Sequence, residues 1–530
     1  MVTGSTANMG PLRGKRDGQR VRVGRWTWLV PLALLSACTA GPSTRPGIVV
    51  NDGVQQQAPP VAQPSGPAPL PELGTPANAK IRWSPCAAEI TATLPRTTLP
   101  TECARVSAVL DSPSLPGQGL ARLQVLKIGS GPVPVAVFND VDGVPGTVYA
   151  ARLAAALPPA LLTEVSLVGV DRRGTGGSDP ARCVPEETRT GIVGLDPREL
   201  DVEAAVDQAR TAGQQCSITL EVRLQALDTW RSAGDAETLR VGLGMTRLHA
   251  IGHGEGSRVL SVFAERYPDR VGRLVLDGLP DPNPDAKIVL EGVAEGADAT
   301  FGAFAEDCAA RGCELGNARA ALTEILDRAE TDPLSTPDDI GITPGVVLRV
   351  LLAGLSDRQS WPTLSRALAD LRSGNTSGVA AAITPVLRET ENRAATFDAT
   401  LVTRCNDTKS RLATEQLTAA AKDWNTRFPV FGALTAQWLA VCSPWPIPSR
   451  ELPQPSARTA PPIVVLGTAT DPVTPLSGTD HAAQQLATAS LVTWQGAGHG
   501  ALGSSACATE AAAAFITEGA VPRDGTVCPP

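Results

Sequence analysis

The stretch Ile251-Gly252-His253-Gly254-Glu255-Gly256-Ser257-Arg258 decides how this chain folds. The apolar run at 248–251 predicts a short buried strand, and residues 257–267 predict a helix that ends at Pro268. Two glycines four residues apart between a strand and a helix are typical of a sharp, strained turn. In hydrolases this turn is the nucleophile elbow, G-x-S-x-G.

Gly254 stands where the elbow motif has its serine. Glycine has no hydroxyl, so it can neither attack a carbonyl group nor be activated by a histidine. The sequence therefore predicts an elbow that lacks its nucleophile.

Two further residues near the C-terminus complete the pattern. Asp471 follows a strand-like run at 463–467, and His499 lies in a glycine-rich loop after a second such run at 490–494. An acid followed by a histidine, each just past a strand, is the order in α/β-hydrolases. We expect Asp471 to orient His499, which would act as a general base.

The sequence allows one route to hydrolysis without the serine, in which Glu255 orients a water molecule and His499 takes its proton. A metal route is not expected. His249 and His253 are four residues apart, but on a strand and a turn, so they do not form the paired zinc face of H-E-x-x-H. The sequence predicts no metal and no cofactor.

Four more segments accompany the elbow and the acid–histidine pair: Cys103-Ala104-Arg105-Val106, residues 171–178, Leu274-Val275-Leu276-Asp277-Gly278 and Gly525-Thr526-Val527-Cys528. Over residues 80–530 the chain resembles the secreted tripeptidyl-aminopeptidase-like serine peptidases of the α/β-hydrolase superfamily. The resemblance implies an α/β fold with a mostly parallel central sheet, flanking helices and an inserted helical cap. It also implies that glycine at position 254 has replaced the nucleophilic serine.

The chain departs from this family at a second place. After the strand at 133–138, relatives carry a G-G-P-G turn whose N–H groups stabilise the oxyanion together with the N–H of the residue after the nucleophile, here Glu255. This chain has Asn139–Gly146 instead, with aspartates at 140 and 142. Carboxylates would repel an oxyanion, and losing one donor costs roughly 3 to 4 kcal/mol. Both departures point away from serine-peptidase chemistry.

The N-terminus predicts export. A basic region precedes an apolar run from Trp26 to Leu35 that is too short for a comfortable membrane span, so residues 1–37 are expected to be a signal peptide. Leu35-Ser36-Ala37-Cys38 matches a bacterial lipobox, which predicts a lipid anchor on Cys38 and a membrane lipoprotein that faces outside. The alternative is a plain signal peptide and a secreted protein.

The ten cysteines other than Cys38 suit five disulfides in an oxidising compartment. Sequence alone cannot determine their connectivity. Pairing between neighbours would join Cys86–Cys103, Cys183–Cys216, Cys308–Cys313, Cys405–Cys442 and Cys507–Cys528.

Charge excludes one class of partner. The first 37 residues carry six of the 46 Lys and Arg but one of the 54 Asp and Glu, so their removal takes the net charge from −8 to −13. Such an acidic protein is a poor binder of phosphate backbones, and no nucleic-acid partner is expected.

The domain organisation follows from these segments. Residues 38–78 are rich in Pro, Gln, Ala and Gly and predict an extended tether. We expect the core at 79–282 and 446–530, with a helical cap inserted at 283–445 that decides what enters the cleft.

Three functions from different classes remain. The first is a degenerate hydrolase whose cleft binds a peptide, a small ester or lipid-like ligand, or a protein partner. The second is an active exported peptidase or esterase that uses a non-standard nucleophile or an activated water. The third is a structural envelope lipoprotein that has kept the fold.

Overall fold

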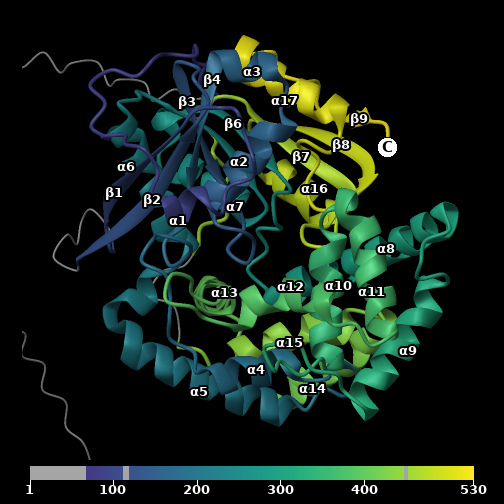
Figure 1. Ribbon diagram of the computed structural model, residues 1–530. Helices are drawn as coiled ribbons and strands as arrows, with labels where there is room; N and C mark the ends of the chain where they lie inside the picture. The colour runs from purple at the N-terminus through teal and green to yellow at the C-terminus, as the bar shows by residue number, and fades with distance from the viewer. Residues whose placement is uncertain (1–66, 112–118, 447–451) are drawn as a thin grey trace, which may run out of the picture. The chain divides into compact units, whose positions relative to one another are not determined.

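The computed structural model describes residues 67–111, 119–446 and 452–530, and they form an α/β structure (Figure 1). The predicted signal peptide, Cys38 and most of the predicted tether lie outside the described residues. Among the helices of the described residues, none is long and apolar enough to span a bilayer.

A nine-stranded sheet forms the core in the order β1-β2-β4-β3-β5-β6-β7-β8-β9. The pairs β1–β2 and β2–β4 are antiparallel, and every later pair is parallel. The strands are β1 (Thr101–Val109), β2 (Leu120–Ile128), β3 (Val133–Phe138), β4 (Val165–Val170), β5 (Leu248–His253), β6 (Val271–Asp277), β7 (Ile463–Thr470), β8 (Ala489–Ala497) and β9 (Thr526–Cys528). The predicted α/β-hydrolase architecture is confirmed.

The central strands are apolar along their whole length because helices cover both faces of a parallel sheet. Every residue of β3, β4 and β6 is buried. The helices that accompany the sheet are α1 (Ala88–Thr91), α2 (Gly146–Ala156), α3 (Pro159–Glu164), α6 (Thr229–Leu243), α7 (Glu255–Arg266), α16 (Leu476–Gln485) and α17 (Ala506–Glu518).

A second layer of helices lies beside the edge of the sheet where the parallel strands end (Figure 1). It comprises α8 (Ala286–Arg311), α9 (Ala318–Thr331), α10 (Pro344–Leu355), α11 (Trp361–Arg372), α12 (Ser377–Leu387), α13 (Thr396–Asp407), α14 (Thr414–Arg427) and α15 (Gly432–Cys442). These helices occupy the span predicted for the cap. Short 3-10 turns lie at Pro197–Glu199, Glu221–Ala226, Pro268–Arg270 and Arg358–Ser360.

The cap layer also contains residues that the sequence assigned to the core. Helices α4 (Glu186–Gly194) and α5 (Val202–Leu220) share hydrophobic clusters with the cap helices and contribute nothing to the main cluster around the sheet. An ion pair of 2.8 Å between Arg189 of α4 and Asp398 of α13 joins the two segments, and both side chains are almost fully buried. The cap is therefore built from two separate stretches of chain.

Five disulfides are present in the described residues, as the cysteine count predicts for an exported protein. They join the five neighbouring pairs: Cys86–Cys103, Cys183–Cys216, Cys308–Cys313, Cys405–Cys442 and Cys507–Cys528. Cys183–Cys216 and Cys405–Cys442 both lie within the cap layer and cross-link its segments.

Candidate functional site

The elbow forms between β5 and α7. The strand ends at His253, the helix begins at Glu255, and Gly254 between them has φ 54° and ψ −122°. This left-handed conformation strains residues that carry a side chain. The helix start also lies against the end of β3, because a Cβ atom at Gly256 would stand 2.6 Å from the backbone nitrogen of Asn139. The second glycine of the motif allows this close approach.

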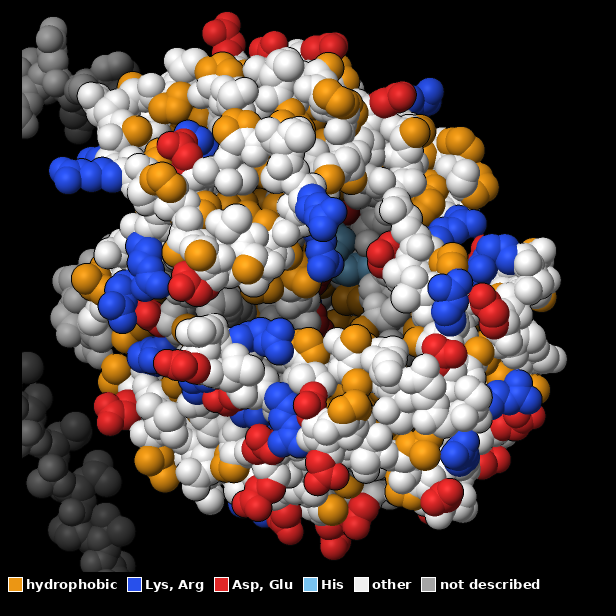
Figure 2. All heavy atoms as spheres, viewed as in Figure 1, with side chains coloured by type: hydrophobic (Ala, Val, Ile, Leu, Met, Phe, Trp, Pro, Cys, Tyr) orange, Lys and Arg blue, Asp and Glu red, His pale blue; other side chains and the backbone are white. Residues whose placement is uncertain are grey.

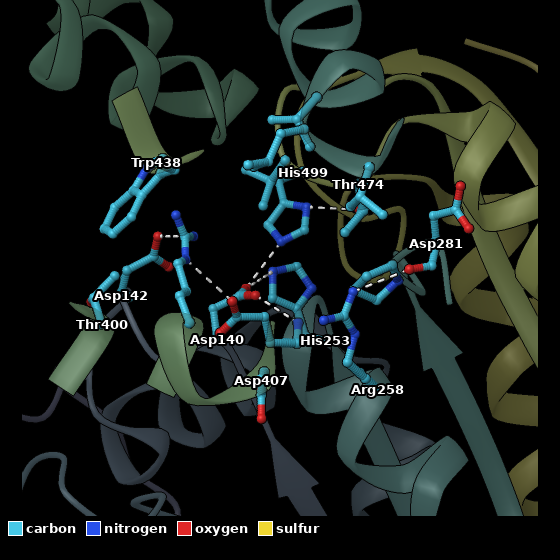
Figure 3. Close-up of a pocket in the computed structure, with 18 of the residues that line it drawn as sticks. Asp140, Asp142, His253, Arg258, Asp281, Thr400, Asp407, Trp438, Thr474 and His499 are labelled. Atoms are coloured by element: carbon cyan, nitrogen blue, oxygen red, sulfur yellow. Dashed lines mark hydrogen bonds and ion pairs between the residues drawn. The ribbon is translucent and has the colours of Figure 1, made fainter. Parts of the chain in front are cut away.

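The carboxylate of Asp140 fills the space where an elbow serine would place its side chain. A Cβ atom at Gly254 would overlap both Asp140 oxygens and stand 2.5 Å from Cγ. Oδ1 accepts a 2.7 Å hydrogen bond from the Glu255 backbone N–H, and Oδ2 lies 3.0 Å from His499 Nε2 (Figure 3). The missing side chain at position 254 is thus what leaves room for Asp140.

The predicted acid and base lie next to each other. Asp471 follows β7, His499 follows β8, and His499 Nδ1 lies 3.0 Å from Asp471 Oδ2. Asp471 also accepts hydrogen bonds from the backbone N–H groups of Val473, Thr474 and Gly500, which fix its orientation. The structure therefore brings together two of the three predicted catalytic positions in the hydrogen-bonded arrangement of a triad.

The charges of Asp140, His499 and Asp471 shift one another's pKa values. Burial alone would lower the pKa of His499, but the carboxylates of Asp471 and Asp140 raise that pKa well above its ordinary value. Burial alone would raise the pKa of Asp140, but His499 and then His253 lower it strongly. An imidazolium held between two carboxylates cannot accept a proton, so this state of His499 does not suit a general base.

Carboxylates of the protein itself occupy the expected oxyanion donors. The Glu255 N–H is bonded to Asp140, and the Val141 N–H donates to Glu255 Oε2 at 3.2 Å. From sequence we expect the carboxylates in the loop at 139–146 to repel an oxyanion, and in the structure one of them is bonded directly to an expected oxyanion donor. Asp140 makes this bond, whereas Asp142 turns away to Arg404, with Oδ2 2.6 Å from Nη2.

Glu255 is not free to orient a water molecule. Its Oε2 lies 3.4 Å from Nη1 of the buried Arg172, and its Oε1 lies 3.4 Å from Nε of Arg404. Both oxygens are held by guanidinium groups, and His499 Nε2 faces Asp140 instead of open space. These contacts with arginines and with Asp140 compete with the water route by way of Glu255.

His253, considered from sequence only as a possible zinc partner of His249, lies in the site beside His499 instead. Its Nδ1 lies 3.2 Å from Asp277 Oδ2, its Nε2 lies 3.7 Å from Asp140 Oδ2, and its ring centroid is 4.3 Å from that of His499. The ring of Tyr149 stacks on the His253 ring with centroids 4.9 Å apart. Asp140, His253 and His499 each offer one atom to a metal ion, and these atoms lie within 4.8 Å of one another.

A cavity of about 740 Å³ opens between the sheet and the cap, with histidine side chains visible in the hollow of Figure 2. Asp140, His253 and His499 line its sheet end, and Arg349 and Trp438 line its cap side. A volume of this size is ordinary for a small-molecule or peptide site.

Arg349 is a site residue that sequence patterns did not reveal. Its Nη2 donates a 2.7 Å hydrogen bond to Gln437 Oε1, while its buried Nε has no hydrogen-bond partner within the described residues. Burial and then the nearby Arg404 lower the pKa of Arg349 to about 10. It is a cation without a carboxylate partner among the ion pairs of the described residues. The only sequence signal is an arginine in an otherwise apolar helix.

Comparisons with known proteins agree with this fold. The chain matches the family described as alpha/beta hydrolase fold over residues 141–321 and the family described as TAP-like protein over residues 428–528. Among curated proteins it is similar to serine protease Hip1 of Mycobacterium tuberculosis, with 27% identity over 86% of this chain and 92% of the relative.

Two further relatives carry other activities in their names. Tripeptidyl aminopeptidase of Streptomyces coelicolor is 24% identical over 86% of this chain and 87% of its own. Carboxylesterase B of Mycobacterium tuberculosis is 26% identical over 81% of this chain and 86% of its own. The chain is thus related to peptidases and to an esterase along most of its length.

Proposed function

We propose that this α/β-hydrolase-fold protein, a relative of the tripeptidyl aminopeptidases and of serine protease Hip1, binds a short peptide in its capped cavity and does not cleave it by serine chemistry. The observation that carries the proposal is the position of Asp140. Its carboxylate stands in the place of the serine side chain, contacts His499 Nε2 and occupies the Glu255 N–H.

Each step of acyl transfer at this elbow loses its participant. No hydroxyl is present to attack, the nitrogen that would take its proton already faces a carboxylate, and a negative charge fills the oxyanion position. Loss of a triad nucleophile alone lowers the rate by about 10⁶. A binding role keeps the cavity in use without this chemistry.

Arg349 supports a peptide with a free carboxylate as the ligand. Its Nε donates no hydrogen bond to any described group. A guanidinium group in the partly buried wall of a cavity can bind a carboxylate through paired N–H donors. The indole of Trp438, 5.9 Å from the guanidinium carbon to the ring centroid, adds an apolar surface beside it. The relatives' names make peptides the first class to test.

The same proposal places the protein outside the cytoplasm, anchored through a lipid on Cys38. The five disulfides and the export signal expected at residues 1–37 support this location. If Cys38 is not acylated, the protein would instead be secreted.

Calorimetry with the purified protein tests the ligand class, using tripeptides with a free C-terminal carboxylate and the same tripeptides as amides. We expect the free acids to bind more tightly. Arg349→Gln should weaken their binding by a factor of about 10 to 100, which is the usual contribution of a charged hydrogen bond. Arg366→Gln, an exposed arginine paired with Glu314 on the outside of the cap, is the control.

Hydrolysis is measured in parallel on aminopeptidase-type tripeptide reporters and short esters, with His499→Ala beside the wild-type protein. Equal background rates in the two proteins together with peptide binding support the proposal. Turnover that disappears with His499 would show a working enzyme and overturn it. If no tripeptide binds, the peptide role is wrong and a structural role gains support.

A further inference from the structure

We propose that Asp140, His253 and His499 form a binding site for a divalent transition-metal ion, with Zn²⁺ as the expected occupant. The two imidazole Nε2 atoms converge on one oxygen, Asp140 Oδ2, at 3.0 Å from His499 and 3.7 Å from His253 (Figure 3). Two ligand atoms bound to one tetrahedral zinc lie about 3.3 Å apart, given zinc–ligand bonds of about 2.0 Å. These two separations lie on either side of that value, and all three ligand atoms lie within 4.8 Å of one another.

The groups around the three ligands are those that a metal site requires. His499 Nδ1 lies 3.0 Å from Asp471, and His253 Nδ1 lies 3.2 Å from Asp277, so each imidazole has a buried carboxylate on the nitrogen that faces away. When a bound ion displaces the proton from His499 Nε2, this becomes the carboxylate–histidine–zinc arrangement, in which the carboxylate fixes the tautomer and directs Nε2 toward the ion. The third ligand is held as well, because Asp140 Oδ1 accepts the Glu255 N–H at 2.7 Å.

A remnant of a serine triad accounts for only half of this arrangement. Asp471 and His499 are the acid and base of the triad pattern, and they need no second histidine. His253 and Asp277 are a second histidine–carboxylate pair, placed at the ends of the adjacent strands β5 and β6. The two pairs meet at the one aspartate that has entered the space left by the missing serine.

The surroundings favour occupancy by a cation that can still take an outside ligand. Asp140, His253 and His499 all line the 740 Å³ cavity, so an ion could reach them from solvent and would keep one position for water or ligand. Two imidazoles and one carboxylate suit Zn²⁺ and its neighbours better than Mg²⁺ or Ca²⁺, which prefer oxygen ligands. Asp140 and His253 are 113 positions apart in the chain, and His253 and His499 are 246 positions apart. No short sequence motif therefore predicts the site.

Metal binding by the purified, tag-free protein tests this inference. The inference does not depend on peptide binding, so the two proposals can fail separately. After dialysis against a chelator, Zn²⁺ is titrated by calorimetry and Co²⁺ by visible absorption, because four-coordinate cobalt gives intense bands. We expect one ion per chain. His253→Ala and Asp140→Ala should each weaken binding at least 100-fold, and Asp277→Asn about 10-fold to 100-fold.

His481→Ala is the matched control, because His481 pairs with Asp281 outside the cluster. This variant should bind Zn²⁺ as tightly as the wild-type protein does. Circular dichroism shows whether each variant is folded. The inference is overturned if the wild-type protein takes up no Zn²⁺ and gives no four-coordinate cobalt spectrum. It is also overturned if folded His253→Ala binds as tightly as the wild-type protein, since the ion would then sit elsewhere.

Discussion

Gly254 and Asp140 occupy one space between them, so substitutions at the two positions should not be independent. A side chain at 254 would overlap the Asp140 carboxylate and stand 2.5 Å from its Cγ. Gly254→Ser must therefore expel Asp140, whereas the same substitution in an Asp140→Ala background no longer meets that carboxylate and keeps only the backbone strain of φ 54°. We expect strong coupling between the two changes in a double-mutant cycle.

The magnitude follows from the bonds that Asp140 makes. Expulsion of its carboxylate breaks the 2.7 Å bond from the Glu255 N–H and the 3.0 Å contact with His499. Hydrogen bonds to charged groups contribute about 1.5 to 3 kcal/mol each, so either single variant should lose roughly 3 to 6 kcal/mol of unfolding free energy. The double variant loses these bonds only once, which gives a coupling energy of about 3 kcal/mol or more.

Urea unfolding of the four proteins in the cycle measures the coupling, and a fluorophosphonate that labels activated serines measures the chemistry. Gly254→Ser alone should show little turnover and little labelling. The double variant frees His499 Nε2 and the Glu255 N–H, so its introduced serine should be labelled, although slowly because Glu255 still occupies the Val141 N–H. Gly254→Ser with Asp142→Ala is the control, since Asp142 pairs with Arg404 instead.

Two results would refute this reasoning. One is additivity of the two substitutions within about 0.5 kcal/mol, which is the behaviour of independent sites. The other is robust hydrolysis or rapid labelling by Gly254→Ser alone, which would mean that the Asp140 carboxylate does not obstruct the elbow.

Three other predictions concern stability and location. Burial and then Asp228 raise the pKa of Asp407 from 3.8 to about 6. The protonated carboxyl group therefore contributes at most about 3 kcal/mol of stability, which is complete below about pH 4 and is lost as the pH rises through about 6. Asp407→Asn should remove this pH dependence from the unfolding free energy measured in urea. Arg189→Met leaves the buried Asp398 carboxylate without its guanidinium and should cost about 3 to 5 kcal/mol in urea unfolding, whereas a loss under about 1 kcal/mol would contradict the burial argument. Cys38→Ala should move the protein from the membrane fraction to the medium, and retention of the variant on membranes would show that Cys38 is not the anchor.

Local pattern was enough for much of the architecture. Apolar runs at 248–251 and 463–467 became strands β5 and β7, and the glycines around position 254 became the turn between β5 and α7. These predictions succeed because strand burial and glycine conformation depend on residues close together in the chain. The same local view misassigned α4 and α5, because a helix does not record which distant surface its apolar face will meet.

The sequence by itself determined the fold class, the absence of the elbow serine and the acid–histidine order. Only the tertiary structure decided that Asp140, 359 residues from His499, would enter the vacant space, while Asp142 turned to Arg404. Two aspartates in one loop are equivalent in sequence, and packing around each side chain distinguishes them. The meeting of His253 with His499 was decided in the same way, because β6 and β7 separate β5 from β8 in the sheet, and only the loop after β8 places the His499 ring centroid 4.3 Å from that of His253.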